Sequence, residues 1–139
     1  MTDTRQMAEL AAVGQSVWLD YIRRDLTTSG ELEGLVADGL RGMTSNPTIF
    51  DNAIGGSDLY DEAIAAFAAS HPDASAIEVF EHVAIEDIQA ACDVLSVVHD
   101  RTGGRDGFVS LEVSPTLVHD TAGTIAEAKR LWAAVDRPN

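Results

Sequence analysis

Cysteine and histidine, which build many metal and redox sites, are scarce in this sequence of 139 residues. Cys92 is the only cysteine, so the chain forms no internal disulfide and lacks the thiolates of a structural zinc cage. The histidines, His71, His82, His99 and His119, are scattered without the short spacing of a ligand pair. We therefore expect no metal, and we assign Cys92 to the core.

Positive charge and long apolar runs are also lacking. Nine Lys and Arg residues face 23 Asp and Glu residues, which gives a net charge of −14. Such a surface repels phosphate backbones and anionic membranes, so we expect neither nucleic acid nor a membrane as a partner. No apolar run approaches the roughly 18 residues that a bilayer span needs, and residues 1–10 lack the apolar core of a signal peptide. These absences predict a cytoplasmic location.

The sequence does contain enough apolar residues, 45%, for one ordinary domain over residues 1–139. Periodicity and turn signals predict strands at 16–20, 40–43 and 108–113. They predict helices at 7–13, 31–36, 48–54, 59–69, 75–101 and 121–135. Strands that alternate with helices are typical of parallel α/β folds. The last helix is followed by Pro138, where a fourth strand would start, so we expect the sequence to stop within a unit.

Two helices carry apolar stripes that should face the core. In the longest helix the apolar residues recur at spacings of three and four. They are Ile77, Phe80, Ala84, Ile88, Ala91, Leu95 and Val98. In the final helix we expect Ile125, Ala128, Leu131, Trp132 and Val135 to point inward. We expect Ser57 or Asp58 to cap the helix at 59–69, Ser75 to cap the longest helix and Thr121 to cap the last.

The segment from Thr44 to Phe50 is the most informative motif. Pro47 stops the second strand and suits the first turn of a helix, since it lacks a backbone N–H. Asn46 is thereby left at the carboxyl end of a buried strand, which is where parallel sheets and barrels bind ligands.

Alternation along the other two strands places carboxylates at the same end. Asp20 shares a strand face with Trp18, and Glu112 shares one with Ser110, while the opposite faces are aliphatic and should pack on helices. We therefore expect Asp20, Asn46 and Glu112 to converge in one layer, as in a general acid/base site. Each also has a structural interpretation. Asp20 could cap a turn, Asn46 could shape one, and Glu112 could pair with an arginine.

Two further polar pairs lie near the ends of predicted elements. Arg23 and Arg24, just after the first strand, could grip an anion, although an ion pair with Asp25 is equally consistent with the sequence. His119 and Asp120 precede the last helix and are interpreted as a loop pair.

The segments 17–24, 44–50 and 110–115 together resemble the transaldolase family. Their order and spacing are similar to those of bacterial members, whose barrel begins with an additional helix. The resemblance covers essentially the whole chain but only the amino-terminal part of a transaldolase. It implies a partial (β/α)₈ TIM barrel, namely the first three β/α units with an extra N-terminal helix.

The resemblance also implies an activity. Transaldolases of the pentose phosphate pathway move a dihydroxyacetone unit from a ketose phosphate, such as sedoheptulose 7-phosphate or fructose 6-phosphate, to an aldose phosphate, without metal or cofactor. Asp20 matches the acid/base residue at the C4 hydroxyl, and Glu112 matches the carboxylate that positions a water. Asn46 matches the amide that holds a substrate hydroxyl, with Thr44 and Ser45 beside it as substrate-binding residues.

One part of the family pattern is missing. In the family a lysine at the end of the fourth strand forms a Schiff base with the ketose, and cleavage needs that electron sink. This sequence has one lysine, Lys129, in the predicted final helix. The resemblance therefore implies an incomplete site that is inactive alone.

Two other interpretations stay open. Three parallel strands leave unpaired edges and an open aliphatic face, which favours a non-catalytic half-barrel that self-associates or binds a partner. The chain could also be the leading part of a fusion between a transaldolase and glucose-6-phosphate isomerase.

Overall fold

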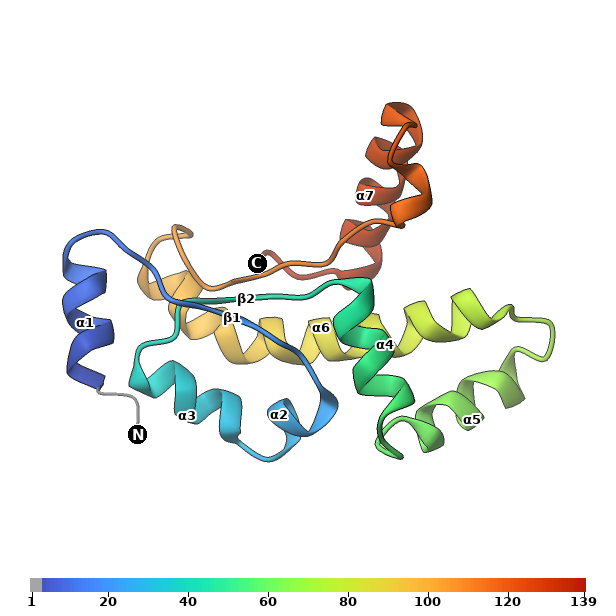
Figure 1. Cartoon of the computed structure of the whole chain (residues 1–139), viewed down its shortest axis with the longest axis horizontal. Coiled ribbons are helices and arrows are strands. Elements are labelled where there is room, and N and C mark those ends of the chain that lie inside the picture. The colour runs from blue at the N-terminus through green and yellow to red at the C-terminus, as the bar shows by residue number, and fades with distance from the viewer. Residues whose placement is uncertain (1–3) are drawn as a thin grey trace.

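The protein is described by a computed structural model that covers residues 4–139. Three short parallel strands form a sheet in the order β1-β2-β3, namely β1 (Trp18–Asp20), β2 (Gly42–Thr44) and β3 (Phe108–Val109). Each strand lies beside the next one in the chain, and helices make the crossovers (Figure 1). The predicted parallel α/β architecture is confirmed, and sequential parallel order is the way a barrel wall grows.

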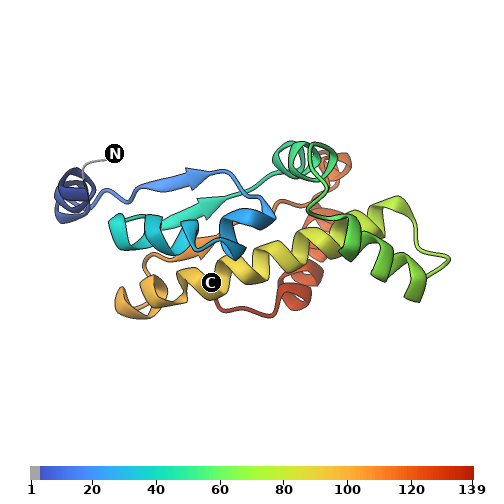
Figure 2. The same ribbon diagram turned by 90° about the horizontal axis from the view of Figure 1, so that it is seen from below.

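The helices are α1 (Thr4–Ala12), α2 (Arg24–Thr28), α3 (Glu31–Asp38), α4 (Pro47–Gly55), α5 (Asp61–Ser70), α6 (Ala76–Arg101) and α7 (Thr121–Val135), with a 3₁₀ turn η1 (Pro115–Leu117). Figure 2 shows α2, α3 and α6 on one side of the strands, whereas among the described residues no helix covers the middle of the other side. Within residues 4–139 no helix is both long enough and apolar enough to span a membrane.

The core lies between the sheet and the helices α2, α3 and α6. Met43 of β2 is fully buried there, together with Ile22, Leu32 and Ile88. The predicted aliphatic strand faces are confirmed, because Val17, Leu19, Val109 and Leu111 pack against this core. The long-helix stripe is confirmed from Ala84 to Val98, and Cys92 is buried with it, but Ile77 is 75% exposed.

The strand register determines which residues lie next to each other on the opposite, helix-free face. Trp18 pairs with Gly42, and Gly42 pairs with Phe108. The indole of Trp18 lies so close that a Cβ at Gly42 would be 2.3 Å from its Cε2 atom. Only glycine fits at this position without moving the ring, so the aromatic side chain covers the start of this face.

Helix caps explain several boundaries. The side chain of Asn46 accepts a hydrogen bond from the N–H of Ile49, and Pro47 occupies the first helical position of α4. Ser75 and Glu78 form a capping box at the start of α6, as expected for Ser75. Gly39 ends α3 with φ at +116°, a conformation that favours glycine.

Two of the predicted caps are wrong. Asp120, rather than Thr121, accepts the hydrogen bond from Gly123 N–H at the start of α7. No side chain caps α5, and the Ser57 hydroxyl instead donates to the carbonyl of Ala53, which closes the preceding helix. The strand limits also differ, since the ladders cover only 18–20, 42–44 and 108–109. The short helix α2 was not predicted.

The prediction for the final helix is wrong over most of its length. Leu131 and Val135 are buried, but Ile125 is 50% exposed, Trp132 is 62% exposed and Ala128 is also exposed. Figure 1 shows α7 projecting away from the other helices, and its side chains Ile125 and Trp132 stay exposed. After α7 the chain returns to β3, where the Val109 N–H donates to the carbonyl of Asn139 at 2.9 Å.

Candidate functional site

The carboxyl ends of β1 and β2 bring two of the predicted site residues into contact. Asp20 is paired with Thr44 in the register, and the Thr44 hydroxyl donates to Asp20 Oδ1 at 2.7 Å. Asp20 is exposed, while Thr44 is half-buried. The hydrogen bond holds the carboxylate on the helix-free face and leaves its other oxygen open to solvent.

The segment after β3 continues alongside β2. The Ser110 N–H donates to the carbonyl of Met43 at 3.0 Å, and the Ser45 hydroxyl donates to the carbonyl of Ser110 at 2.6 Å. Ser110 is thereby placed level with Thr44. Ser45 itself is buried, and this bond joins the two segments; its predicted role in substrate binding stays a prediction.

The strand register separates two of the predicted site residues. Asp20 is level with Thr44, so Asn46 lies two residues farther along the chain, just beyond the end of β2. Glu112 lies two residues beyond Ser110, outside the paired part of β3. Asp20 and Asn46 therefore do not share one row, and the convergence of all three groups stays a prediction.

Asn46 serves as a helix cap without using its donor group. Its Oδ1 accepts from Ile49 N–H at 2.9 Å, which confirms the structural interpretation. Its amide nitrogen has no hydrogen-bond partner within residues 4–139. The cap fixes the side-chain rotamer, and the free N–H₂ group can donate to a ligand oxygen.

Glu112 is exposed and forms no ion pair with any arginine among the residues described, so the proposed strand-end salt bridge is absent there. It lines a cavity of about 220 Å³ together with Pro47, Phe80 and Ser114. The cavity lies between the start of α4, the long helix α6 and the segment after β3.

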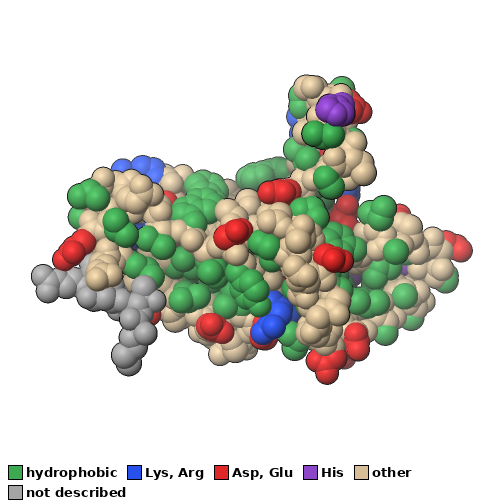
Figure 3. All heavy atoms as spheres, viewed as in Figure 1, with side chains coloured by type: hydrophobic (Ala, Val, Ile, Leu, Met, Phe, Trp, Pro, Cys, Tyr) green, Lys and Arg blue, Asp and Glu red, His purple; other side chains and the backbone are tan. Residues whose placement is uncertain are grey.

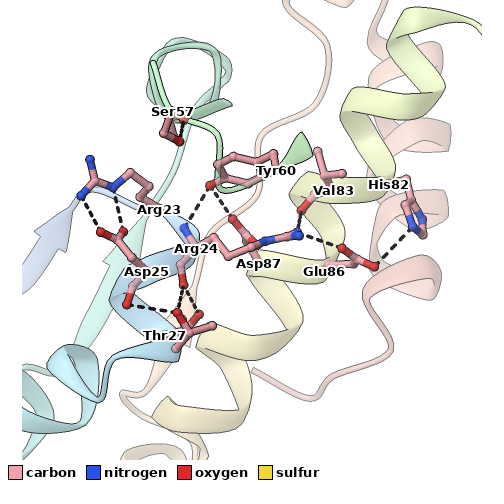
Figure 4. A network of polar contacts seen from close by, with 12 residues as sticks. Arg23, Arg24, Asp25, Thr27, Ser57, Tyr60, His82, Val83, Glu86 and Asp87 are labelled. Atoms are coloured by element: carbon pink, nitrogen blue, oxygen red, sulfur yellow. Dashed lines mark hydrogen bonds and ion pairs between the residues drawn. The ribbon is translucent and has the colours of Figure 1, made fainter. Parts of the chain in front are cut away.

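Behind the site lies a buried polar network that sequence reasoning missed (Figure 4). Arg24 donates through Nε to Asp87 at 2.8 Å and through a terminal nitrogen to Glu86 at 2.8 Å. The Tyr60 hydroxyl donates to the other oxygen of Asp87 at 2.7 Å and accepts from the Arg24 backbone N–H at 3.0 Å. Through Arg24, the network connects the segment after Asp20 to α6 and to the start of α5.

Burial dominates the electrostatics of this network. It raises the pKa of Asp87, although hydrogen bonds from Tyr60 and Arg24 oppose the shift. Burial also raises the pKa of Tyr60, and the hydrogen bond to Asp87 adds to the effect. One sequence signal could have found the network: Asp87 is an acid next to Ile88 on the buried stripe of α6, where a charge needs a partner.

The neighbouring arginine behaves differently. Arg23 forms an exposed ion pair with Asp25 at 2.5 Å, which confirms the ion-pair interpretation for this residue. The hydrogen bond from Arg23 lowers the pKa of the Asp25 carboxyl.

Neither a metal centre nor an amine nucleophile is found in the described part of the chain. Residues 4–139 contain no group of three or more His, Cys, Asp or Glu side chains that could hold a metal ion. Lys129 is exposed on α7 and belongs to no strand end. The arrangement thus offers a carboxylate held by a hydroxyl and, just beyond the end of β2, a donor amide, which suits proton transfer and the binding of hydroxyl groups.

Comparison with known proteins shows which sequences this chain is similar to. Residues 17–139 match the family model described as transaldolase/fructose-6-phosphate aldolase. The chain is 45% identical over 133 residues to the transaldolase of Neisseria meningitidis serogroup C (strain FAM18), covering 96% of this chain and 37% of the relative. It is 48% identical over 134 residues to the transaldolase of Frankia alni, covering 96% and 36%. The chain thus spans little more than a third of the length of these relatives.

Proposed function

Because the chain belongs to the transaldolase/fructose-6-phosphate aldolase family, we propose that it supplies the first three β/α units of a transaldolase barrel, with residues 1–139 as one folding unit. The completed barrel transfers a dihydroxyacetone unit from a ketose phosphate to an aldose phosphate. The observation that carries the proposal is the contact between Thr44 and Asp20 at the carboxyl ends of β1 and β2, with Asn46 just beyond the end of β2.

Each residue has a role that its surroundings support. Asp20 takes the proton from the C4 hydroxyl while the C3–C4 bond breaks, and Thr44 keeps its carboxylate aimed at the helix-free face. Asn46 uses its free amide N–H₂ to donate to a hydroxyl oxygen of the three-carbon unit that remains. Glu112, which is exposed, accepts a hydrogen bond from the water that the reaction uses.

The electron pair of the broken bond needs a sink, which a protonated imine on a lysine provides. Lys129 does not suit this role, because it is exposed on α7 and lies outside the strand ends. The chain therefore contributes the groups that assist the reaction, and the imine-forming lysine belongs to a later strand of the barrel.

A chimera tests this proposal. Residues 17–139 replace the matching segment of the Frankia alni transaldolase, and transfer from fructose 6-phosphate to an aldose phosphate is measured. We expect activity, and we expect Asp20→Asn to lower kcat by about 10²- to 10⁴-fold, because proton transfer at C4 is lost. The control Asp73→Asn removes an exposed loop carboxylate and should leave kcat unchanged.

The unfused chain provides the complementary experiment. With fructose 6-phosphate and borohydride it should give no reduced adduct at Lys129, as judged by mass spectrometry. A folded chimera without activity, or equal activity of Asp20→Asn and Asp73→Asn, contradicts the proposal. So does an adduct at Lys129.

A second candidate function is self-association, and the exposed apolar side of α7 favours it. Trp132 and Leu131 line a cavity of about 240 Å³ with Val109 and Leu111, along the edge of β3. A second copy that covers this surface would remove the apolar side chains from water.

A further inference from the structure

The opposite end of the sheet, where the strands begin, holds a cavity that the proposed function does not use. Its volume is about 360 Å³, and three segments line it. Ser16 comes from the connection between α1 and β1, and Arg41 comes from the residue before β2. Thr102, Arg105 and Asp106 come from the turn that follows α6. Cavities of this size hold small metabolites.

Arg41 is the unusual residue of this cavity. Its backbone is fixed, since its N–H donates to the carbonyl of Val17 and its carbonyl accepts from Gly107 N–H. Its Nε atom is buried and has no hydrogen-bond partner among the residues described. A buried donor without a partner is costly, and in native proteins such a group usually has a ligand, an ion or a water.

This lack of a partner stands out in so acidic a chain, where carboxylates are plentiful. Among the side chains that the structure describes, the arginines that pair with carboxylates are Arg23, Arg24, Arg130 and Arg137. Arg41 forms no such pair within residues 4–139, although the sequence has 23 acidic residues and a net charge of −14.

The second arginine of the cavity is also free to bind an anion. Arg105 is exposed, and its Nε donates to the carbonyl of Thr102 at 3.1 Å, while no carboxylate of the described chain pairs with it. The single acid of the lining, Asp106, accepts from the Ser16 hydroxyl at 2.6 Å and is held by that bond. Two guanidinium groups and one carboxylate leave the lining with an excess of positive charge. Figure 3 shows basic side chains (blue) at this end of the molecule, over the turn after α6.

We propose that this cavity binds a small phosphate-bearing anion. The planar guanidinium group matches two phosphate oxygens at once, and a phosphate between Arg41 and Arg105 would meet two arginines that pair with no carboxylate among the described residues. The volume exceeds that of phosphate alone, so a phosphomonoester of a small alcohol or sugar also fits. The cavity lies at the strand ends opposite to Asp20, and this binding is therefore independent of the proposed catalytic role.

Calorimetric titration of the 139-residue chain tests the proposal, with inorganic phosphate in one arm and glycerol 3-phosphate in the other. We expect saturable binding in at least one arm, and binding of glycerol 3-phosphate alone would identify esters as the ligand. Arg41→Gln combined with Arg105→Gln should weaken the affinity about tenfold or more, since both guanidinium groups are lost. Asp106→Asn should tighten it several-fold, because the only opposing charge is removed while the Ser16 bond is kept.

Arg101→Gln is the matched control. Arg101 is an exposed arginine in the last turn of α6, close in sequence to the cavity but not part of its lining. Its loss changes the net charge equally and should alter the affinity by less than about twofold. Arg105→Gln alone, an exposed substitution that leaves the fold intact, keeps the test decisive if the double variant unfolds. Absence of binding in both arms overturns the proposal, and so does an equal loss of affinity with Arg101→Gln.

Discussion

Arg23 and Arg24 are adjacent in sequence, yet their surroundings make their contributions to stability very different. Arg24 is 19% exposed and pairs with Asp87, whose side chain is 3% exposed. Removing one member of a buried pair leaves a charge without compensation, so Arg24→Ala should lower the free energy of unfolding by about 3 kcal/mol. Arg23→Ala removes only an exposed ion pair with Asp25 and should leave the free energy of unfolding nearly unchanged. Urea denaturation of both variants at pH 7 measures the difference, and equal losses would contradict this view.

The loss of unfolding free energy caused by Arg24→Ala should depend on pH. Burial raises the pKa of Asp87 in the folded chain, so its protonated form is stabilised by folding more than its charged form. Stability from such a group is complete below its unfolded pKa of about 3.9 and falls as the pH rises through the folded pKa. Without Arg24 the folded pKa rises further. The deficit of Arg24→Ala relative to the native chain should therefore be smaller near pH 4 than at pH 7.

At the scale of single residues, the sequence predicted the local role of a side chain better than it predicted the distant residue with which that side chain pairs. Asn46 before Pro47 indicated both a cap and a site, and its two functional groups make these roles compatible. Arg24 was recognised only as a cation near a strand end, because its partner Asp87 lies 63 positions away. No spacing rule connects residues across that distance.

At the scale of elements, the capping box of α6 is the most testable local feature. The Ser75 hydroxyl accepts from Glu78 N–H, and the Ser75 N–H donates to the Glu78 carboxylate at 2.8 Å. Ser75→Ala should lower the free energy of unfolding by about 1 kcal/mol, because an N–H group at the helix start loses its acceptor. Thr121→Ala, at the start of α7 where Asp120 is the cap, is the control and should have a much smaller effect.

The same box predicts an acid-sensitive contribution. The hydrogen bond from the Ser75 N–H lowers the pKa of Glu78 below its ordinary value of 4.5. The Glu78 carboxylate therefore stabilises the folded chain above that value, and this stabilisation is lost as the pH falls through the lowered folded pKa. Glu78→Gln lacks this titration, so the stability difference between the native chain and the variant should shrink on acidification. A difference that is independent of pH would contradict the assignment.

Apart from the short helix α2, the element types followed from the sequence, whereas the strand lengths did not. The alternation at 108–113 correctly placed Val109 and Leu111 on the core side, but hydrogen bonding to β2 ends soon after Ser110, since α4 begins at Pro47. Strand length depends on the neighbour as well as on the pattern. The register between strands, which pairs Asp20 with Thr44 and not with Asn46, depends on the neighbouring strand in the same way.

At the scale of the whole molecule, the apolar surface of α7 is what the sequence could least explain. A stripe at helical spacing predicts an inward face, but it does not say which element will cover that face. Of the predicted stripe on α7, only Leu131 and Val135 are buried within residues 4–139, against α6 and the segment after β3. The exposed remainder explains why the prediction for Ile125 and Trp132 was wrong, and it is a surface available for association.

Self-association of the 139-residue chain should therefore depend on this helix. We expect a mass above the monomer value of 14.8 kDa that rises with protein concentration, and rises further with salt, because salt screens the repulsion from a net charge of −14. Ile125→Ser combined with Trp132→Ser should return the mass to that of the monomer. Since these side chains are 50% and 62% exposed, the free energy of unfolding should change little.

Val97→Ser on α6, which is 55% exposed, is the charge-neutral control and should leave the association intact. Multi-angle light scattering measures all three chains, and a native chain that stays monomeric at high concentration and high salt would rule out this surface as an interface between copies.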